Sequence, residues 1–436
     1  MRPIYLDHAS TTPLDPRVRD RMLPYLSEEF GNPSAIYAPG RVARRAVDDS
    51  RDGIARIFGA SAEEIIFTGS GTESDNLAIL GVARAYNRKP TDPRAPAPQF
   101  RHIITSSIEH HAVLRTCEHL EKCENFSVTY LKPDEYGQIS PETVAAALTP
   151  ETILVSVMYA NNEIGTINPI AAISKKLQEY KQILARKPTE APFLHTDACQ
   201  AAGFLPLNAK QLGVDLMTIN GSKIYGPKGI GALYVRRGLK LEPLIHGGGQ
   251  EFKLRSGTEN VASIVGFAEA LRLAHEERGV ESARLSALRD TLISAILKTI
   301  PNTVLNGHPT ERLPNNANVS VLGIEGEAIL LYLDSYGISA STGSACDSAS
   351  LEPSHVILGL GRPYEHAHGS IRFTLGRGTT EADIQYVLEV LPKIVDILRC
   401  MSPVRITAEE TKKIGSQAAT DIAGAFVDLG RPHWEK

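Results

Sequence analysis

Seven short apolar runs, rich in β-branched residues, recur through the first 235 residues and alternate with segments of helical periodicity. This alternation is typical of βα units built around a mostly parallel sheet. We therefore predict an α/β fold whose large domain contains a seven-stranded, mostly parallel sheet. Ligands of open α/β sheets bind beyond the carboxyl ends of the strands, so the functional site is expected there. The predicted strands are 64–68, 102–106, 127–131, 152–158, 193–196, 216–220 and 232–235.

The remaining chain has a different pattern. A long helical stretch at 260–300 leads into a smaller α+β C-terminal domain. We expect a large domain over 1–260, a connecting helix and small domain over 261–403, and a tail over 404–436, with the N-terminal segment a candidate to pack on the small domain. The small domain is predicted to contain strands 317–321, 337–340 and 370–374 and helices 326–336 and 380–401.

Composition excludes several classes of protein. With 42% hydrophobic and 22% charged residues and a formal net charge of −4, the chain has the composition of a soluble globular protein and has no basic stripe for direct nucleic-acid binding. Apolar stretches such as 153–157 are too short to span a membrane, and the N-terminus has no apolar signal region, so a cytoplasmic protein is expected. The 5 cysteines form no C-x-x-C pair, which argues against a disulfide framework or a structural zinc site and for a reducing compartment. We predict no intrinsic metal site.

One cysteine, Cys346, lies within a run of small residues, Ser341-Thr342-Gly343-Ser344-Ala345-Cys346-Asp347-Ser348-Ala349-Ser350. Such a run cannot build a core, so it favours an exposed, mobile loop in which the thiolate is accessible for nucleophilic chemistry. The alternative is a small buried hydrophobe. The other four cysteines fall in segments predicted as strand or helix and are expected to lack an exposed, flexible setting.

A reactive amine is predicted at Lys223, which directly follows the strand 216–220 and precedes a Gly/Pro-rich turn. A lysine that forms a Schiff base with an aldehyde cofactor needs such a fixed position beside the cofactor. The alternatives are a solvated surface lysine or the rival amine Lys228, which is farther from the strand end.

The other requirements of a pyridoxal 5′-phosphate (PLP) site are met by polar residues after other strands. Gly71 and Thr72 open a helix after the strand 64–68, where backbone N–H groups favour a phosphate, and Asn220 and Ser222 are compatible donors. Asp197 ends a buried strand and could keep the pyridine nitrogen protonated, the alternative being a helix-capping role. The ring's other contacts are predicted from Asn162, Gln200 and, for stacking and proton transfer, His110.

Together these motifs resemble the group I cysteine desulfurases, in the class V aminotransferase branch of fold type I PLP enzymes. The resemblance runs from Tyr5 to about Pro403. It rests on Tyr5-Leu6-Asp7-His8-Ala9-Ser10-Thr11-Thr12-Pro13, Gly31-Asn32-Pro33-Ser34, Gly71-Thr72-Glu73-Ser74-Asp75-Asn76, Asn161-Asn162-Glu163-Ile164-Gly165, His195-Thr196-Asp197-Ala198-Cys199-Gln200, Arg255-Ser256-Gly257-Thr258 and Gly343-Ser344-Ala345-Cys346.

The resemblance implies a role for each matching residue. Lys223 would form the Schiff base, Asp197 would pair with the pyridinium, His110 would stack on the ring as an acid/base, and Cys346 would accept sulfur. Asn162 and Arg372 would bind the substrate carboxylate, for which a guanidinium fork is a natural receptor. Thr258 would reach the phosphate of a neighbouring subunit, which implies a homodimer. Many members have a His and a Ser where this chain has Ser222 and Asn220.

The implied activity is PLP-dependent removal of sulfur from L-cysteine, giving L-alanine and a persulfide on Cys346. The persulfide would pass to an acceptor protein, such as an iron–sulfur scaffold or a tRNA-thiolation protein, and Cys346 could transiently ligate an iron–sulfur cluster. A selenocysteine lyase, or another class V aminotransferase-type PLP enzyme, is the alternative, although transamination has no use for a mobile thiol. A scaffold or binding subunit without cofactor would leave Lys223 unmodified.

Overall fold

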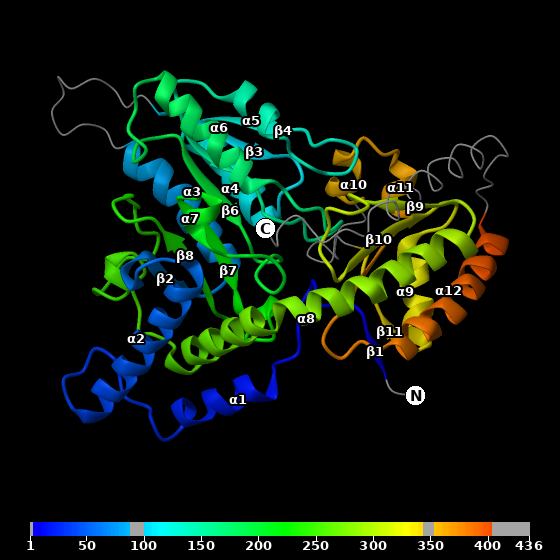
Figure 1. The fold of residues 1–436 in the computed structure, drawn as a ribbon, viewed down its shortest axis with the longest axis horizontal. Helices are drawn as coiled ribbons and strands as arrows, with labels where there is room; N and C mark the ends of the chain where they lie inside the picture. Colours follow the sequence, from blue (N-terminus) through cyan, green and yellow to red (C-terminus); the bar gives the residue numbers. More distant parts are fainter. Residues whose placement is uncertain (1–2, 88–99, 343–352, 403–436) are drawn as a thin grey trace.

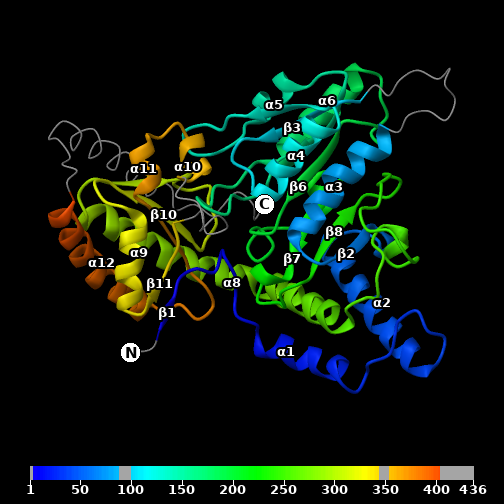
Figure 2. The same cartoon turned by 180° about the vertical axis from the view of Figure 1, so that it is seen from behind.

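A computed structural model describes residues 3–87, 100–342 and 353–402 of the chain. Cys346 and the predicted tail therefore lie outside the described residues. The described part divides its apolar residues between cores around a seven-stranded sheet and a further core around a three-stranded sheet (Figures 1 and 2).

The large sheet has the strand order β2-β8-β7-β6-β5-β3-β4. All neighbours are parallel except β8, which runs antiparallel to both β2 and β7. The predicted mostly parallel, seven-stranded sheet is thus confirmed. Its strands are β2 (Ile65–Thr68), β3 (His102–Ser106), β4 (Ser127–Leu131), β5 (Thr152–Ser156), β6 (Phe193–Asp197), β7 (Leu216–Asn220) and β8 (Gly231–Val235).

Helices cover both faces of this sheet. Because successive strand residues point to opposite faces, Ile65 and Phe67 enter one apolar cluster while Ile66 enters the other. One cluster takes in α3 (Gly71–Tyr86) and α4 (His111–Cys123). The opposite cluster takes in α1 (Pro16–Met22), α2 (Ala38–Phe58), α5 (Pro141–Ala147), α6 (Ile170–Ile183), α7 (Ala209–Leu212) and the first half of α8 (Val261–Thr299).

The 39-residue helix α8 connects the two parts of the molecule. Its first half packs into the large-sheet core, and its second half, from Leu285 to Ile296, packs into the second core. That core also contains α9 (Gly326–Ser335), α12 (Glu381–Met401) and an antiparallel sheet of β9 (Thr303–Asn306), β10 (Asn316–Val321) and β12 (Ser370–Thr374), in the order β12-β10-β9. Two short helices, α10 (His355–Gly359) and α11 (Tyr364–His368), lie beside it (Figure 1).

The N-terminal segment belongs to both parts. β1 (Ile4–Tyr5) pairs in parallel with β11 (Ile338–Ser339), and Ile4 and Leu6 are buried in the second core. The chain then crosses to the large sheet, where Thr12 N–H donates to the carbonyl of Ser222 at 2.9 Å. Residues 7–12 form a connection, called here the N-terminal strap, that lies between the two cores.

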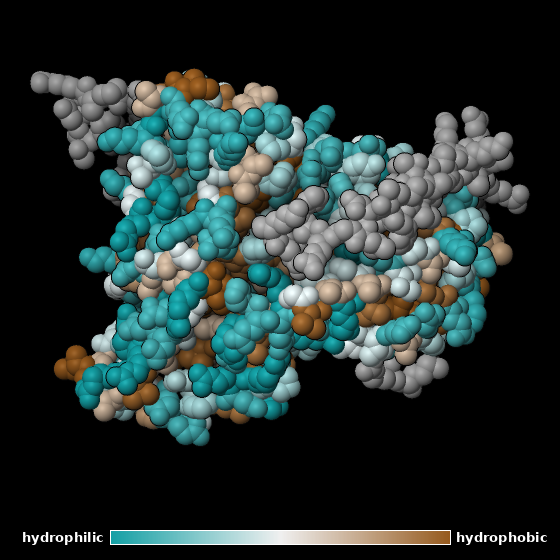
Figure 3. Space-filling model, viewed as in Figure 1, coloured by the Kyte–Doolittle hydropathy of each residue, from teal (hydrophilic) through white to brown (hydrophobic). Residues whose placement is uncertain are grey.

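The surface is that of a molecule with its apolar residues inside. Hydrophilic residues cover most of the face drawn in Figure 3. Within residues 3–87, 100–342 and 353–402, no helix is long and apolar enough to cross a membrane, and no cluster of His, Cys, Asp and Glu could hold a metal ion.

Candidate active site

A cavity of ≈ 420 Å³ lies at the carboxyl ends of the large sheet's strands, where it meets the second core. The parallel strands β2, β3, β5, β6 and β7 all end on this side, so the polar residues that follow each of them meet here. Of the predicted site residues, Gly71, Thr72, His110, Asn162, Asp197, Gln200, Asn220, Lys223 and Arg372 line the cavity.

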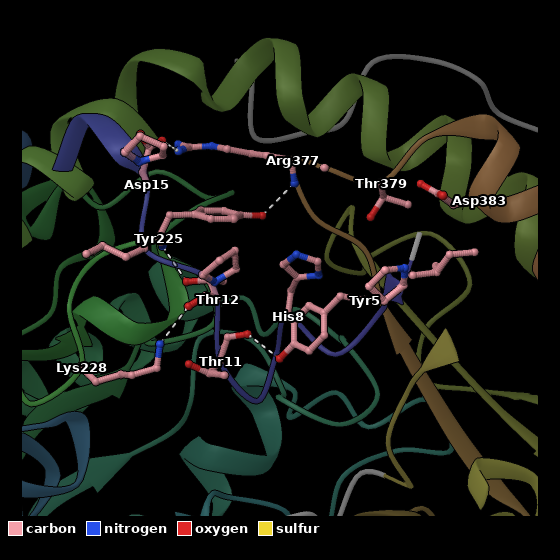
Figure 4. A pocket seen from close by; sticks show the side chains of 16 residues that line it. Tyr5, His8, Thr11, Thr12, Asp15, Tyr225, Lys228, Arg377, Thr379 and Asp383 are labelled. Atoms are coloured by element: carbon pink, nitrogen blue, oxygen red, sulfur yellow. Dashed lines mark hydrogen bonds and ion pairs between the residues drawn. The ribbon is translucent and has the colours of Figure 1, made fainter. Parts of the chain in front are cut away.

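Lys223 enters the cavity from a short 3₁₀ turn, Gly221–Lys223, that directly follows β7. Its Nζ donates to the carbonyl of Ser10 in the N-terminal strap at 2.5 Å. Lys228 points elsewhere: its Nζ donates to the carbonyl of Thr12 at 3.1 Å and lines a separate cavity of ≈ 680 Å³ (Figure 4). Of the two lysines weighed from the sequence, only Lys223 is placed among the other predicted site residues.

The start of α3 forms one end of the cavity. Ser70 caps the helix by accepting the Glu73 N–H at 3.1 Å, whereas the N–H groups of Gly71 and Thr72 have no carbonyl of their own helix to bind. A Cβ on Gly71 would lie 2.8 Å from the Cys199 sulfur and 3.3 Å from Asn220 Nδ2, so only glycine leaves this end of the cavity open.

Two predicted phosphate contacts lie outside this cavity. Ser222 is half-buried, and its carbonyl faces Thr12 of the strap rather than the start of α3. Thr258 is exposed and does not reach the cavity of its own chain. Its loop is nevertheless tied to the start of α3, because Arg255 Nε donates to Glu73 at 2.9 Å and Glu73 also accepts the Gly69 N–H at 2.8 Å.

Asp197 lies at the other end, at the last position of β6, with 8% of its surface exposed. Its Oδ1 accepts the Cys199 N–H at 2.9 Å. Two further carboxyls, those of Asp75 and Glu109, are buried nearby, and burial raises the pKa of both well above the usual value, with the charge of Asp197 adding to the shift. Three carboxyl groups thus lie close together at this end of the cavity.

His195 lies two residues before Asp197 on β6, and its imidazole is buried and neutral. Burial lowers its pKa to about 4. Its two ring nitrogens contact hydroxyl groups, Nδ1 with Ser156 Oγ at 2.8 Å and Nε2 with Thr218 Oγ1 at 3.1 Å. His195 therefore supports the strand that carries Asp197 and adds no positive charge to the site.

His110 caps the N-terminus of α4 and lines the cavity. Its Nδ1 accepts the Ala112 N–H at 3.1 Å. A ring nitrogen that accepts a hydrogen bond carries no proton, so the exchangeable proton of a neutral His110 lies on Nε2. The cap thus fixes which nitrogen can transfer a proton.

Arg372 comes from β12 of the second core and is only 2% exposed. Its Nη1 donates to the Asn162 carbonyl at 2.9 Å, and its Nη2 donates to Asp7 Oδ1 at 2.7 Å and Ser10 Oγ at 2.8 Å. Arg372 Nε and Asn162 Oδ1 are buried without a hydrogen-bond partner among the described residues. The guanidinium is therefore held firmly while part of its donor capacity is unused.

Several residues of this site were missed by the sequence analysis. Asp7 and Ser10 accept hydrogen bonds from Arg372, and the Ser10 carbonyl also accepts one from Lys223. The segment that contains them, Tyr5 to Pro13, was used in the sequence analysis only as a family landmark. Cys199 lines the cavity from the turn after β6, where burial raises the pKa of its thiol. Its position two residues after Asp197 was the sequence signal that could have placed Cys199 in the site. Cys123 and Cys400 are exposed, but both lie in helices, α4 and α12, as expected for cysteines outside a flexible loop.

The segment that carries Cys346 starts and ends beside the cavity. Ser341 and Arg372 exchange backbone hydrogen bonds of 2.6 and 3.1 Å. At the far end, Ser354 Oγ donates to Glu163 at 2.5 Å, and His355 Nε2 contacts the Glu109 carbonyl at 3.0 Å. The described residues on both sides of Cys346 are thus fixed against elements that line or support the cavity.

Known proteins resemble this chain over nearly its whole length. The Aminotransferase class-V family matches residues 4–387. A cysteine desulfurase IscS of Dictyoglomus turgidum is 50% identical over 412 residues, covering 94% of this chain and 99% of the relative. A cysteine desulfurase IscS of Methanosarcina thermophila is 51% identical over 400 residues, covering 92% and 94%.

Solved structures agree. A NifS-like protein superimposes with a TM-score of 0.81 at 33% identity, covering 91% of this chain and all of the other, 100%. SspA, solved in complex with cysteine, gives a TM-score of 0.71 at 34% identity, covering 85% and 98%. At these TM-scores and coverages, the proteins share the fold of this chain over most of its length. The chain therefore belongs to the class-V aminotransferase family and, within it, to the PLP-dependent cysteine desulfurases.

Proposed function

We propose that the described cavity removes sulfur from L-cysteine, releases L-alanine and leaves a persulfide on Cys346. The observation that carries this proposal is the convergence of Lys223, Asp197 and His110, from the large sheet, with Arg372, from the second core, on one cavity. Such a cavity can bind an aldehyde cofactor and an α-amino acid side by side. The cysteine desulfurase relatives and the cysteine complex of SspA support L-cysteine as the substrate.

The residues present fit PLP. The open cradle at Gly71 and the unused N–H groups of Gly71 and Thr72 suit a phosphate, and the donor Nδ2 of Asn220 lies beside Gly71 at the same end of the cavity. Asp197 would face the pyridine nitrogen, Gln200 and Asn162 its polar substituents, and His110 its ring. When bound through Lys223, PLP supplies an electron sink for the bonds around the substrate Cα.

The chain's own residues then bind and orient the substrate. Arg372 Nε is a donor available to the substrate carboxylate, the side-chain Nδ2 of Asn162 would be the second donor, and Asp7 and Ser10 keep the guanidinium in place. His110 Nε2 is the atom placed to exchange a proton, because Nδ1 is committed to the Ala112 N–H. Lys223 can exchange a proton with the substrate once its amine is released, and the Ser10 carbonyl can then accept a hydrogen bond from that amine.

In the sulfur-transfer step the Cys346 thiolate attacks the substrate sulfur. A sulfur–sulfur bond forms as the Cβ–S bond breaks, and the electron pair of that bond stays on the carbon skeleton, which takes up a proton to become the methyl group of alanine. Cys346 is five residues beyond Ser341, which spans up to about 17 Å when extended. The attachment point is suitable, since Ser341 is paired with Arg372, whose side chain lines the cavity.

The persulfide would pass to an acceptor protein of the iron–sulfur or tRNA-thiolation type, and Cys346 would be the residue that transiently contacts a cluster. We also propose a cytoplasmic homodimer in which Thr258 completes the phosphate site of the neighbouring chain. This is supported by its exposed position on a loop tied to the start of α3 through Arg255 and Glu73.

The test is an assay of sulfide and alanine from L-cysteine with wild type and Cys346→Ser, together with mass spectrometry of the protein after brief exposure to L-cysteine. We expect one added sulfur on the Cys346 peptide of the wild type and no alanine from the variant. The exposed Cys123 is the matched control, and Cys123→Ser should behave as wild type. Normal desulfuration by Cys346→Ser would refute the thiol mechanism and favour a selenocysteine lyase, whose leaving group needs no thiolate acceptor.

A further inference from the structure

The side-chain hydroxyl of one residue of the N-terminal strap, Thr12, bridges the turn that carries Lys223. Thr12 Oγ1 donates to the Ser222 carbonyl at 3.1 Å and accepts the Tyr225 N–H at 2.7 Å. Ser222 precedes Lys223 by one residue and Tyr225 follows it by two. The Thr12 side chain, which is 2% exposed, therefore links the residues on either side of Lys223, the residue that the proposed function assigns to the cofactor.

The backbone at Tyr225 needs this support. Its φ is 63°, in the left-handed region that a bulky side chain adopts only when its surroundings enforce it. Besides the Thr12 hydroxyl on its N–H, its carbonyl accepts the Asp15 N–H at 3.0 Å, and its ring lies 4.5 Å from the Arg377 guanidinium (Figure 4). The partners of Tyr225 on its N–H and its carbonyl both come from the N-terminal stretch of the chain.

The main chain of Thr12 strengthens the same attachment. Its N–H donates to the Ser222 carbonyl at 2.9 Å, and its carbonyl accepts Lys228 Nζ at 3.1 Å, as Figure 4 shows. The amine of Lys223 itself donates to Ser10, two residues earlier in the strap. The strap thus contacts the lysine turn before, at and after Lys223.

We infer that Thr12 is a positioning residue for Lys223: its hydroxyl bridge fixes the turn so that the amine reaches the cofactor aldehyde. This rests on the proposed function only in taking Lys223 as the residue that binds PLP. Thr12 is not a catalytic residue, since it does not line the cofactor cavity and lies on the side of the strap that faces the ≈ 680 Å³ cavity.

The chain offers matched variants. Thr12→Val keeps the shape of the side chain and removes both hydrogen bonds of the hydroxyl, while Thr12→Ser keeps the hydroxyl. Thr11→Val is the control in the same strap, because Thr11 Oγ1 has no hydrogen-bond partner among the described residues.

The experiment is a double-mutant cycle on cofactor binding, measured by titrating apoprotein with PLP and following visible absorbance. We expect Thr12→Val to weaken PLP binding about tenfold in the chain with Lys223 and less than twofold in the Lys223→Ala chain, which cannot form the covalent bond. Borohydride reduction at saturating PLP should fix less cofactor on the Lys223 peptide of Thr12→Val. Thr12→Ser and Thr11→Val should stay within twofold of wild type in both readouts.

Equal weakening by Thr12→Val in both backgrounds would show a general structural role and overturn the inference, as would a loss of lysine labelling in Thr12→Ser. Failure of Thr12→Val to fold, checked by circular dichroism, would likewise show that Thr12 supports the fold rather than the turn. A wild type that does not bind PLP would overturn both this inference and the proposed function. A wild type that binds PLP but does not desulfurate L-cysteine would overturn only the latter.

Discussion

The glycine that opens α3 controls the width of the phosphate end of the cavity, and Gly71→Ala tests this directly. The added Cβ would stand 2.8 Å from the Cys199 sulfur, whereas an ordinary contact needs about 3.5 Å, so the sulfur must move by roughly 0.7 Å. Cys199 is only 8% exposed, so its sulfur can move only against packed neighbours. The substitution therefore narrows the phosphate end of the cavity.

The cost of such overpacking is about 1–3 kcal/mol. If this free-energy cost is added only to the protein with PLP bound, the affinity for PLP drops by roughly 5- to 150-fold, since about 1.4 kcal/mol corresponds to a factor of ten. Gly71 is the first residue of α3 and its φ is not in the left-handed region, so alanine introduces no backbone strain that could give the same result. The measurement is the PLP dissociation constant from visible absorbance, with thermal unfolding of the apoprotein beside it.

Cys199→Ala removes the sulfur with which the added Cβ clashes, and so tests the steric argument in the double variant. Removing the sulfur leaves only the 3.3 Å contact with Asn220 Nδ2, so the double variant should recover most of the lost affinity, with a coupling of about 1 kcal/mol or more. If Gly71→Ala binds PLP as tightly as wild type, or if Cys199→Ala gives no recovery, the steric argument is wrong.

Three further outcomes are expected. Borohydride reduction of the protein with bound PLP should label the peptide of Lys223, which lines the cofactor cavity, and label on Lys228 would contradict the assignment. Arg372→Gln should raise the KM for L-cysteine by roughly 10- to 100-fold with a smaller change in kcat, because it removes a charged hydrogen bond to the carboxylate; an unchanged KM would place the carboxylate elsewhere. Because the pKa of His195 is lowered to about 4 in the folded chain, only the unfolded chain takes up this proton as pH falls from about 6.5, so stability should drop over that window by up to about 3 kcal/mol. His195→Gln should lose this part of the pH dependence in denaturant titrations, whereas an identical pH profile would show that the imidazole is protonated in the fold.

The strands of the large sheet could be read from the sequence because each is buried and rich in β-branched residues. β3, β4 and β7 begin and end at the predicted residues. The short strands β1 and β9 were not predicted; they form by pairing with β11, which lies far along the chain, and with β10.

Part of the site could likewise be read from local sequence pattern, and part could not. The sequence determined that polar residues follow strands β2, β3, β5, β6 and β7, and parallel strands must bring such residues together at their carboxyl ends. It also placed Lys223 directly after a strand. These features depend on local pattern and on the direction of each strand, both of which are written along the chain.

Only the tertiary structure decided what holds these groups. The Ser10 carbonyl accepts a hydrogen bond from Lys223, which is 213 residues away in the sequence, and Asp7 accepts one from Arg372, which is 365 residues away. Thr12 reaches the lysine turn in the same way. No local pattern encodes such contacts, because they arise when the N-terminal strand pairs with β11 in one core and the following residues cross to the other.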